Sequence, residues 1–175
     1  MFEIRIHSRG GQGGVTAARL LAMAAFLDKK HATAAPFYGA ERRGAPVTSF
    51  VRIDSEPIKI YSQIRSPNLI IVLDASIMDA VDVLQGIQKG GTVLINSPHP
   101  VVLPGVEVIT IDLTGIALSV DLVVSGSPIL NTPVLGALAK MGVISRESAE
   151  SAIRDMFSDE RNVKAAEAAY KELIL

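Results

Sequence analysis

Apolar and polar residues alternate at the start of the chain, and the spacing then changes to that of a helix. The alternation over residues 2–7 predicts a first strand. A glycine loop follows at 8–14. Residues 15–28 are rich in alanine and leucine, with small apolar side chains on one face, as in a helix packed closely on a flat surface. Strand, glycine turn and helix together predict the opening of an α/β unit.

The next part of the chain indicates that the sheet is mixed. Residues 47–53 alternate again, and we expect residues 57–61 to be their hairpin partner across a turn at 54–56. Residues 32–35 are a candidate for a further short strand. An antiparallel pair inside an α/β chain predicts a sheet that is mostly, but not entirely, parallel.

A continuous apolar run over residues 69–73 is typical of a central parallel strand that is buried on both faces. We expect a helix over residues 75–87, with Ile77, Val81 and Leu84 facing inward. Further strands are predicted at 92–95 and 106–111, and further helices at about 113–119, 133–141, 146–157 and 160–173.

These elements predict one domain over residues 1–175, since no repeat, linker or low-complexity stretch interrupts them. The fold class is α/β. We expect a three-layer α/β/α sandwich with a mostly parallel, mixed sheet and a helical C-terminal end.

The composition excludes several classes of protein. With 49% hydrophobic and 20% charged residues, the chain is not intrinsically disordered. Its 17 basic and 18 acidic residues nearly balance, so no overall field attracts nucleic acid or a membrane, and any anion site must be local. The chain has no cysteine, which excludes disulfides, thiolate-bound iron–sulfur clusters and cysteine zinc sites.

Targeting and metal-binding signals are also missing from the sequence. The three histidines are not paired at ligand spacing, so no metal site is expected. The N-terminus lacks the pattern of a signal peptide, and no apolar run approaches the ~18 residues that a membrane span needs. We therefore expect a soluble, cytoplasmic protein.

The glycine loop is the strongest candidate for chemistry. Glycine lets the backbone approach an anion closely, and the following helix directs its free N–H groups at the loop, so a phosphate-bearing ligand is expected. The loop is not a P-loop, because no Gly-Lys-Ser/Thr is present. It is also a poor dinucleotide fingerprint, because Thr16 replaces the third glycine and residues 33–36 lack the acidic residue. A tight turn without a ligand is the alternative.

Two other segments could bind a ligand. Arg42 and Arg43 are adjacent and flanked by glycines and a proline, so they could clamp a phosphate or carboxylate. A solvated charged turn is the alternative. Asn131 and Thr132 precede Pro133, which suits the first turn of a helix, so they could cap that helix, contact a ligand or do both.

Asp74 and His7 end predicted strands. We expect Asp74 to cap the next helix, with ligand contact at the edge of the sheet as the alternative. His7 is a weaker candidate for ligand contact. No nucleophile, base and acid occur together, so the sequence assigns no catalytic residue.

Three segments together carry a resemblance to a known family. They are His7 to Ala18 (HSRGGQGGVTAA), Pro36 to Arg52 (PFYGAERRGAPVTSFVR) and Pro128 to Ala137 (PILNTPVLGA). The chain resembles, over essentially its whole length, the gamma subunit of 2-oxoacid:ferredoxin oxidoreductases, with the pyruvate and ketoisovalerate types nearest. One departure is Ser8, where the family usually has glycine. A left-handed backbone at that position would strain a serine.

The resemblance implies one subunit of an enzyme complex. Such complexes oxidatively decarboxylate a 2-oxoacid on thiamine diphosphate, reduce ferredoxin through iron–sulfur clusters and pass the acyl group to coenzyme A. Thiamine diphosphate, Mg and the [4Fe-4S] clusters would lie in the partner alpha, beta and delta subunits, which fits the absence here of cysteine and of a Gly-Asp-Gly motif. The gamma subunit would help form the coenzyme A site and the subunit interface.

The residues that the resemblance implies for this site are Arg9, Gly10, Gly11, Gln12 and Gly13, followed by Arg42, Arg43, Asn131 and Thr132. We expect Arg9 and Arg42 to pair with phosphate. Gln12 and Asn131 would form hydrogen bonds with pantetheine. The oxoacid, pyruvate or 2-oxoisovalerate, would be selected outside this chain. Two alternatives stay open: a purely structural assembly subunit, and a stand-alone nucleotide-binding α/β protein.

Overall fold

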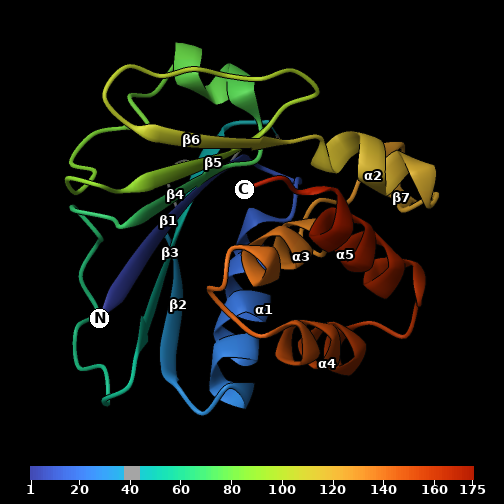
Figure 1. Ribbon diagram of the computed structural model, residues 1–175, viewed down its shortest axis with the longest axis horizontal. Helices are drawn as coiled ribbons and strands as arrows, with labels where there is room; N and C mark the ends of the chain where they lie inside the picture. The colour runs from blue at the N-terminus through green and yellow to red at the C-terminus, as the bar shows by residue number, and fades with distance from the viewer. Residues whose placement is uncertain (38–43) are drawn as a thin grey trace.

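The computed structural model describes residues 1–37 and 44–175, and it is built around a six-stranded sheet (Figure 1). The strands of this sheet are β1 (Phe2–Arg9), β2 (His31–Phe37), β3 (Pro46–Asp54), β4 (Leu69–Val72), β5 (Thr92–Asn96) and β6 (Glu107–Ile111). The helices are α1 (Gly14–Leu27), α2 (Leu113–Ser119), α3 (Pro133–Lys140), α4 (Arg146–Met156) and α5 (Arg161–Glu172), with a 3₁₀ turn η1 (Ala75–Asp79). Two short strands, β7 (Val123–Val124) and β8 (Ser127–Pro128), pair separately.

The order of strands in the sheet is β2-β3-β1-β4-β5-β6. The neighbouring pairs β1–β4, β4–β5 and β5–β6 are parallel, whereas β3 is antiparallel to both β1 and β2. Strand β3 therefore runs against the other five. The expectation of a mostly parallel, mixed sheet is confirmed.

Helices α1, α3, α4 and α5 lie on one side of the sheet, and η1 lies on the other (Figure 1). On the helical side, fully buried Ile4 and Ile6 of β1 belong to the same apolar cluster as Leu21 of α1. On the opposite side, Ile77 of η1 is fully buried against β4 and β5, and Val81 and Leu84 pack inward there as expected. This bears out the three-layer arrangement and the helical C-terminal end.

The expected helix over residues 75–87 is wrong beyond Asp79, where η1 ends. The chain continues as turns because its backbone groups are engaged elsewhere. The side chain of Asp82 accepts a hydrogen bond from the N–H two residues later, and the buried guanidinium of Arg5 donates to the carbonyl oxygen of Val83 over 2.8 Å. Such side-chain bonds compete directly with helical ones.

The expected strand at residues 57–61 is also wrong, because β3 has no free edge to pair with it. One edge of β3 is bonded to β1 over residues 46–53 and the other to β2 over residues 48–54. Pro57 could not donate to a ladder in any case. The candidate strand at 32–35 is confirmed as part of β2, and it takes the place of the expected partner.

Candidate functional site

The glycine loop turns β1 into α1 through two residues with left-handed backbone. Gly11 has φ of +94° and Gly13, which occupies the N-cap position of α1, has φ of +85°. Side chains other than glycine are strained there. Gly14 is required for a different reason, because a Cβ atom at that position would overlap Oγ of buried Ser8. Ser8 itself lies in β1 and is not among the residues with positive φ, so serine is unstrained at this departure from the family pattern.

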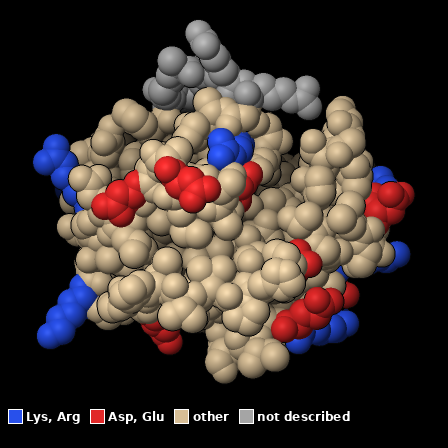
Figure 2. Space-filling view, turned by 90° about the horizontal axis from the view of Figure 1, so that it is seen from above, with Lys and Arg blue, Asp and Glu red and all other residues tan. Residues whose placement is uncertain are grey.

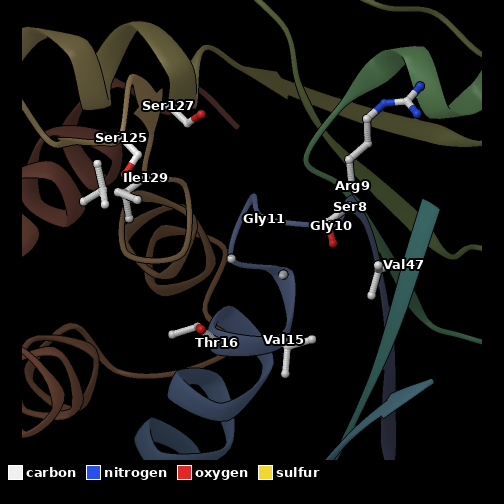
Figure 3. A pocket seen from close by; sticks show the side chains of 13 residues that line it. Ser8, Arg9, Gly10, Gly11, Val15, Thr16, Val47, Ser125, Ser127 and Ile129 are labelled. Atoms are coloured by element: carbon white, nitrogen blue, oxygen red, sulfur yellow. The ribbon is translucent and has the colours of Figure 1, made fainter. Parts of the chain in front are cut away.

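A cavity of about 710 Å³ opens beside this loop (Figure 3). It lies at the N-terminus of α1, where the free N–H groups and the helix dipole favour an anion. Its lining combines main chain of the glycine loop with hydroxyl and aliphatic side chains. These side chains include Ser8, Thr16, Val47, Ser125, Ser127 and Ile129.

The side chain of Arg9 points away from the loop toward the segment that carries η1 (Figure 3). Its guanidinium donates to Oγ of Ser76 over 2.7 Å and to the carbonyl oxygen of Gly44 over 3.0 Å. It also lies 3.3 Å from the Asp74 carboxylate. Arg9 is thus at the rim of the cavity, with its charge partly neutralised by Asp74.

Gln12 lies between the two left-handed glycines and is bonded at both ends of its carboxamide. Its Oε1 accepts a hydrogen bond of 2.7 Å from the main-chain N–H of Arg9, and its Nε2 donates to Oδ2 of Asp74 over 2.7 Å. The glycine loop is therefore tied to the end of β4.

Asp74 caps η1, as expected from the sequence. Its Oδ1 accepts from the main-chain N–H of Ser76 over 3.0 Å. Burial raises the pKa of the Asp74 carboxyl, but hydrogen bonds from Ser76 and Gln12 and the charge of Arg9 outweigh burial and hold the pKa below its usual value. The carboxylate consequently stays ionised at neutral pH.

The segment that begins at Gly44 lies beside the glycine loop. Gly10 donates its N–H to the carbonyl oxygen of Ala45 over 2.9 Å, and Gly44 donates to the carbonyl oxygen of Gly10 over 3.2 Å. Two motifs that are more than 30 residues apart in the sequence thus meet. The candidate residues Arg42 and Arg43 lie outside the residues that the structure describes.

Asn131 lies against the loop, whereas Thr132 faces another helix. A Cβ atom on Gly13 would lie 3.2 Å from Cβ of Asn131, so the two residues are in direct contact. Asn131 is buried and its Oδ1 has no hydrogen-bond partner among the described residues. Thr132 occupies the N-cap position of α3, but its Oγ1 donates to Asn162 over 3.3 Å and makes no capping bond. Pro133 begins α3, as expected.

A second cavity, of about 530 Å³, lies at the carboxyl ends of β4, β5 and β6. Besides Gln12 and Asp74, it is lined by Asn96, Asp112 and Thr114, which the sequence analysis missed. The available signal was positional, because Asn96 ends β5 and Asp112 follows β6. Ser127 lines both cavities, so they are neighbours.

His7 is buried and lies outside the lining of either cavity. Its Nε2 accepts a hydrogen bond of 3.1 Å from Nε of Arg5. Burial and then the charge of Arg5 lower the pKa of His7 to about 4. The imidazole is therefore neutral at physiological pH and acts as an acceptor that holds Arg5.

The described residues include no group of three or more His, Cys, Asp or Glu side chains that could hold a metal ion. None of their helices is both long and apolar enough to cross a bilayer. On the face shown in Figure 2, Lys and Arg are scattered singly among Asp and Glu over the described part of the surface.

Comparison with known proteins decides the family. The family model for pyruvate ferredoxin/flavodoxin oxidoreductase matches residues 3–172. The chain belongs to this family. Its glycine loop and the segment from Gly44 onward, which the structure brings together, are thus parts of a pyruvate ferredoxin/flavodoxin oxidoreductase subunit.

Two similar proteins match over nearly their whole length. Pyruvate synthase subunit PorC of Methanocaldococcus jannaschii is 49% identical over 178 residues, which cover 99% of this chain and 98% of that protein. The common subunit gamma of the pyruvate/ketoisovalerate oxidoreductases of Thermococcus kodakarensis is 48% identical over 187 residues, covering 100% and 98%. The resemblance seen in the sequence is confirmed, and the chain is a gamma-type subunit of an oxidoreductase complex.

Solved structures agree with the fold. Pyruvate oxidoreductase subunit PORC of Thermotoga maritima has a TM-score of 0.83 at 31% identity, covering 99% of this chain and 97% of that one. The 2-oxoglutarate:ferredoxin oxidoreductase of Magnetococcus marinus, solved with 2-oxoglutarate, coenzyme A and succinyl-CoA bound, has a TM-score of 0.79 at 21% identity, covering 97% of this chain and 30% of that one. At that identity the likeness carries the fold alone.

Proposed function

We propose that this chain forms the anion-binding part of the coenzyme A site in a cytoplasmic 2-oxoacid:ferredoxin oxidoreductase. The complex would convert pyruvate or 2-oxoisovalerate to the acyl-CoA and reduce ferredoxin. One observation carries the proposal: the glycine loop and the N-terminus of α1 open together onto the 710 Å³ cavity. Coenzyme A carries a pyrophosphate and a 3′-phosphate, which suit such a helix terminus.

The remaining lining of the cavity supports a ligand that is only partly charged. The hydroxyl groups of Thr16, Ser125 and Ser127 can hydrogen-bond polar groups, while Val47 and Ile129 offer aliphatic surface. Pantetheine combines amide groups with methylene groups in the same way. Arg42 and Arg43 remain proposed phosphate contacts, because Gly44, the next residue along the chain, is bonded to Gly10.

The residues present do not suit the other cofactors of such a complex. The chain has no cysteine to bind an iron–sulfur cluster, and the described residues form no acidic or histidine cluster for a metal. Thiamine diphosphate, which supplies the carbon nucleophile of such enzymes, would accordingly be held with Mg and the [4Fe-4S] clusters in the alpha, beta and delta partners. The residues of this chain would bind and orient coenzyme A.

A charge placed in the first turn of α1 tests this proposal. Thr16→Glu puts a carboxylate where the helix dipole favours it, so α1 is not weakened, yet the carboxylate repels phosphate in the adjoining cavity. In the assembled complex we expect the KM for coenzyme A to rise at least about ten-fold, a loss near 1.4 kcal/mol. The neutral control Thr16→Gln should change it far less.

The same experiment separates the alternatives. Equal KM values for the Glu and Gln variants, in complexes that remain intact on gel filtration, would reject an anionic ligand in this cavity. Loss of the partner subunits from both variants would instead favour a purely structural role for the loop. A chain that purifies without partners and binds a nucleotide would favour the stand-alone alternative.

A further inference from the structure

The glycine loop and Asp74 face each other where the direction of the chain connections reverses. Strands β1 and β4 are parallel neighbours. The chain leaves β1 toward α1 on one face of the sheet, and it leaves β4 toward η1 on the other face (Figure 1). Ligands of open α/β sheets bind at such a point, outside the carboxyl ends of the strands. Here the two sides of the crevice are joined by side chains.

The carboxylate of Asp74 accepts hydrogen bonds from residues on both sides of this crevice. Oδ1 of Asp74 accepts from the main-chain N–H and the hydroxyl of Ser76, over 3.0 and 2.6 Å. Oδ2 accepts from Nε2 of Gln12 over 2.7 Å and lies 3.3 Å from Nε of Arg9. Asp74 follows β4, whose residues are all buried, so the carboxylate is attached to the buried core of the sheet.

Gln12 connects Asp74 to the glycine loop. Its main-chain N–H donates to the carbonyl oxygen of Arg9 over 3.0 Å, while its Oε1 accepts from the N–H of the same residue. Two hydrogen bonds therefore close the turn from Arg9 to Gln12. Its neighbours Gly11 and Gly13 have no side chains and the widest choice of backbone conformations. Gln12 carries the one side chain between them that can fix the direction of the loop N–H groups.

Arg9 forms a second connection in the same direction. Its guanidinium binds Ser76, which Asp74 holds, and the carbonyl oxygen of Gly44 on the neighbouring segment. These bonds hold the side chains of Arg9 and Gln12 against the protein, and they use only part of the five N–H donors of the Arg9 guanidinium. The main-chain N–H groups at the start of α1 have no partner within the helix, so they are also available to an anion.

We infer that Asp74 is a positioning residue for the coenzyme A site, acting through Gln12 and Arg9 to hold the glycine loop in its anion-binding conformation. This inference rests on the proposed function. It gives Gln12 and Arg9 a supporting role besides the direct ligand contacts expected from the sequence. A preorganised loop binds more tightly because less conformational freedom is lost when the ligand arrives.

The test is steady-state kinetics of the assembled complex with Asp74→Asn and Gln12→Ala. We expect each variant to raise the KM for coenzyme A about ten-fold, the typical effect of one lost charge-assisted hydrogen bond, with kcat little changed at saturating coenzyme A. The double variant should be little worse than either single variant, since both break the same connection. Asp159→Asn is the matched control, because the Asp159 carboxylate likewise accepts from the main-chain N–H two residues later and pairs with an arginine, Arg161, but lies outside the lining of both cavities.

A charge exchange separates positioning from general damage. Gln12→Glu combined with Asp74→Asn restores one donor and one acceptor across the crevice, and it should recover most of the lost affinity. Gln12→Glu alone places two carboxylates together and should not. Failure of the pair to rescue, or a fall in kcat without a change in KM, would overturn the inference.

The outcome is distinguishable from failure of the proposed function. If Thr16→Glu raises the KM while Gln12→Ala and Asp74→Asn leave it unchanged, only the positioning role is wrong. If none of the three changes it, the coenzyme A site itself is wrong. If the complex that carries Asp74→Asn fails to assemble, the Gln12→Ala variant decides the question, because the Gln12 side chain is only half-buried.

Discussion

Gly136 of α3 lies directly against the main-chain carbonyl group of Ala166 in α5. A Cβ atom on Gly136 would overlap that carbonyl oxygen, and the neighbour is backbone, which cannot turn aside as a side chain could. Both helices belong to the main apolar cluster on the helical side of the sheet. The absence of a side chain at Gly136 therefore sets how closely α3 and α5 approach.

Gly136→Ala should lower the free energy of unfolding by about 1–3 kcal/mol through overpacking, although alanine is the better helix former. Urea denaturation of the full chain measures this loss. Ser151→Ala, on an exposed position of α4, is the control and should stay within about 0.5 kcal/mol of the parent. A Gly136→Ala protein as stable as the parent would show that the helices can separate without cost.

Buried His7 should make the fold sensitive to acid. Its pKa is about 4 in the folded chain, below the value of 6.5 expected when unfolded, so the unfolded chain takes up the proton first. Stability is therefore complete above about pH 6.5 and is lost progressively toward pH 4, by up to about 3 kcal/mol. Thermal unfolding between pH 7 and 4 should show a shallower decline for His7→Gln. The exposed His31→Gln should behave like the parent, and identical profiles for all three proteins would contradict the assignment.

Asp28 joins the end of α1 to the start of α4. Its carboxylate accepts from Oγ and the main-chain N–H of Ser145, over 2.6 and 2.7 Å. Burial raises its pKa, but the hydrogen bonds from Ser145 and Ser148 outweigh burial and leave the pKa below its usual value. The stabilisation is thus present at neutral pH and is lost as the pH falls through the folded value.

We expect Asp28→Asn to lower the free energy of unfolding by about 1–2 kcal/mol at neutral pH, with a smaller difference in acid. Ser145→Ala should have a similar effect, and the double variant should lose less than the sum of the two. Additive losses in a denaturation cycle would mean that the two residues stabilise the chain independently.

Ser8 and Gly14 should be coupled in the same manner. Gly14→Ala would overlap Oγ of Ser8, so we expect it to cost about 1–3 kcal/mol in stability. Adding Ser8→Gly removes the obstructing hydroxyl and should recover much of that loss. If Gly14→Ala is equally harmful with and without Ser8→Gly, the steric explanation is wrong. Denaturation of the four proteins provides the comparison.

Much of the fold was predictable because its signals are local. The apolar run at 69–73 and the alternation at 47–53 became β4 and β3, and the C-terminal helices lie where their periodicity indicated. Residues 57–61 could not be judged in this way, since whether a segment pairs depends on which edges of β3 are free. That is a property of the sheet order, which local patterning does not contain.

The features of the site also differ in whether the sequence predicts them. The glycine loop was recognisable, because Gly11 and Gly13 indicate a left-handed backbone conformation that other residues avoid. The bond from Gln12 to Asp74 was not, because it joins residues 62 positions apart and exists only where β1 and β4 lie side by side. The same holds for the bond from Arg5 to Val83, which joins residues 78 positions apart and occupies a carbonyl group inside the expected helix at 75–87.

The two main-chain bonds between Gly10 and the segment at Gly44 and Ala45 extend the ladder of β1 and β3 past its last residue pair, Arg9 and Pro46. The amide protons of Gly10 and Gly44 are therefore released by one shared opening of this ribbon. In hydrogen exchange the two amides should slow together when the cavity is filled. A pair of glycine signals, far apart in the sequence, can thus report occupancy of the site without a label on the ligand.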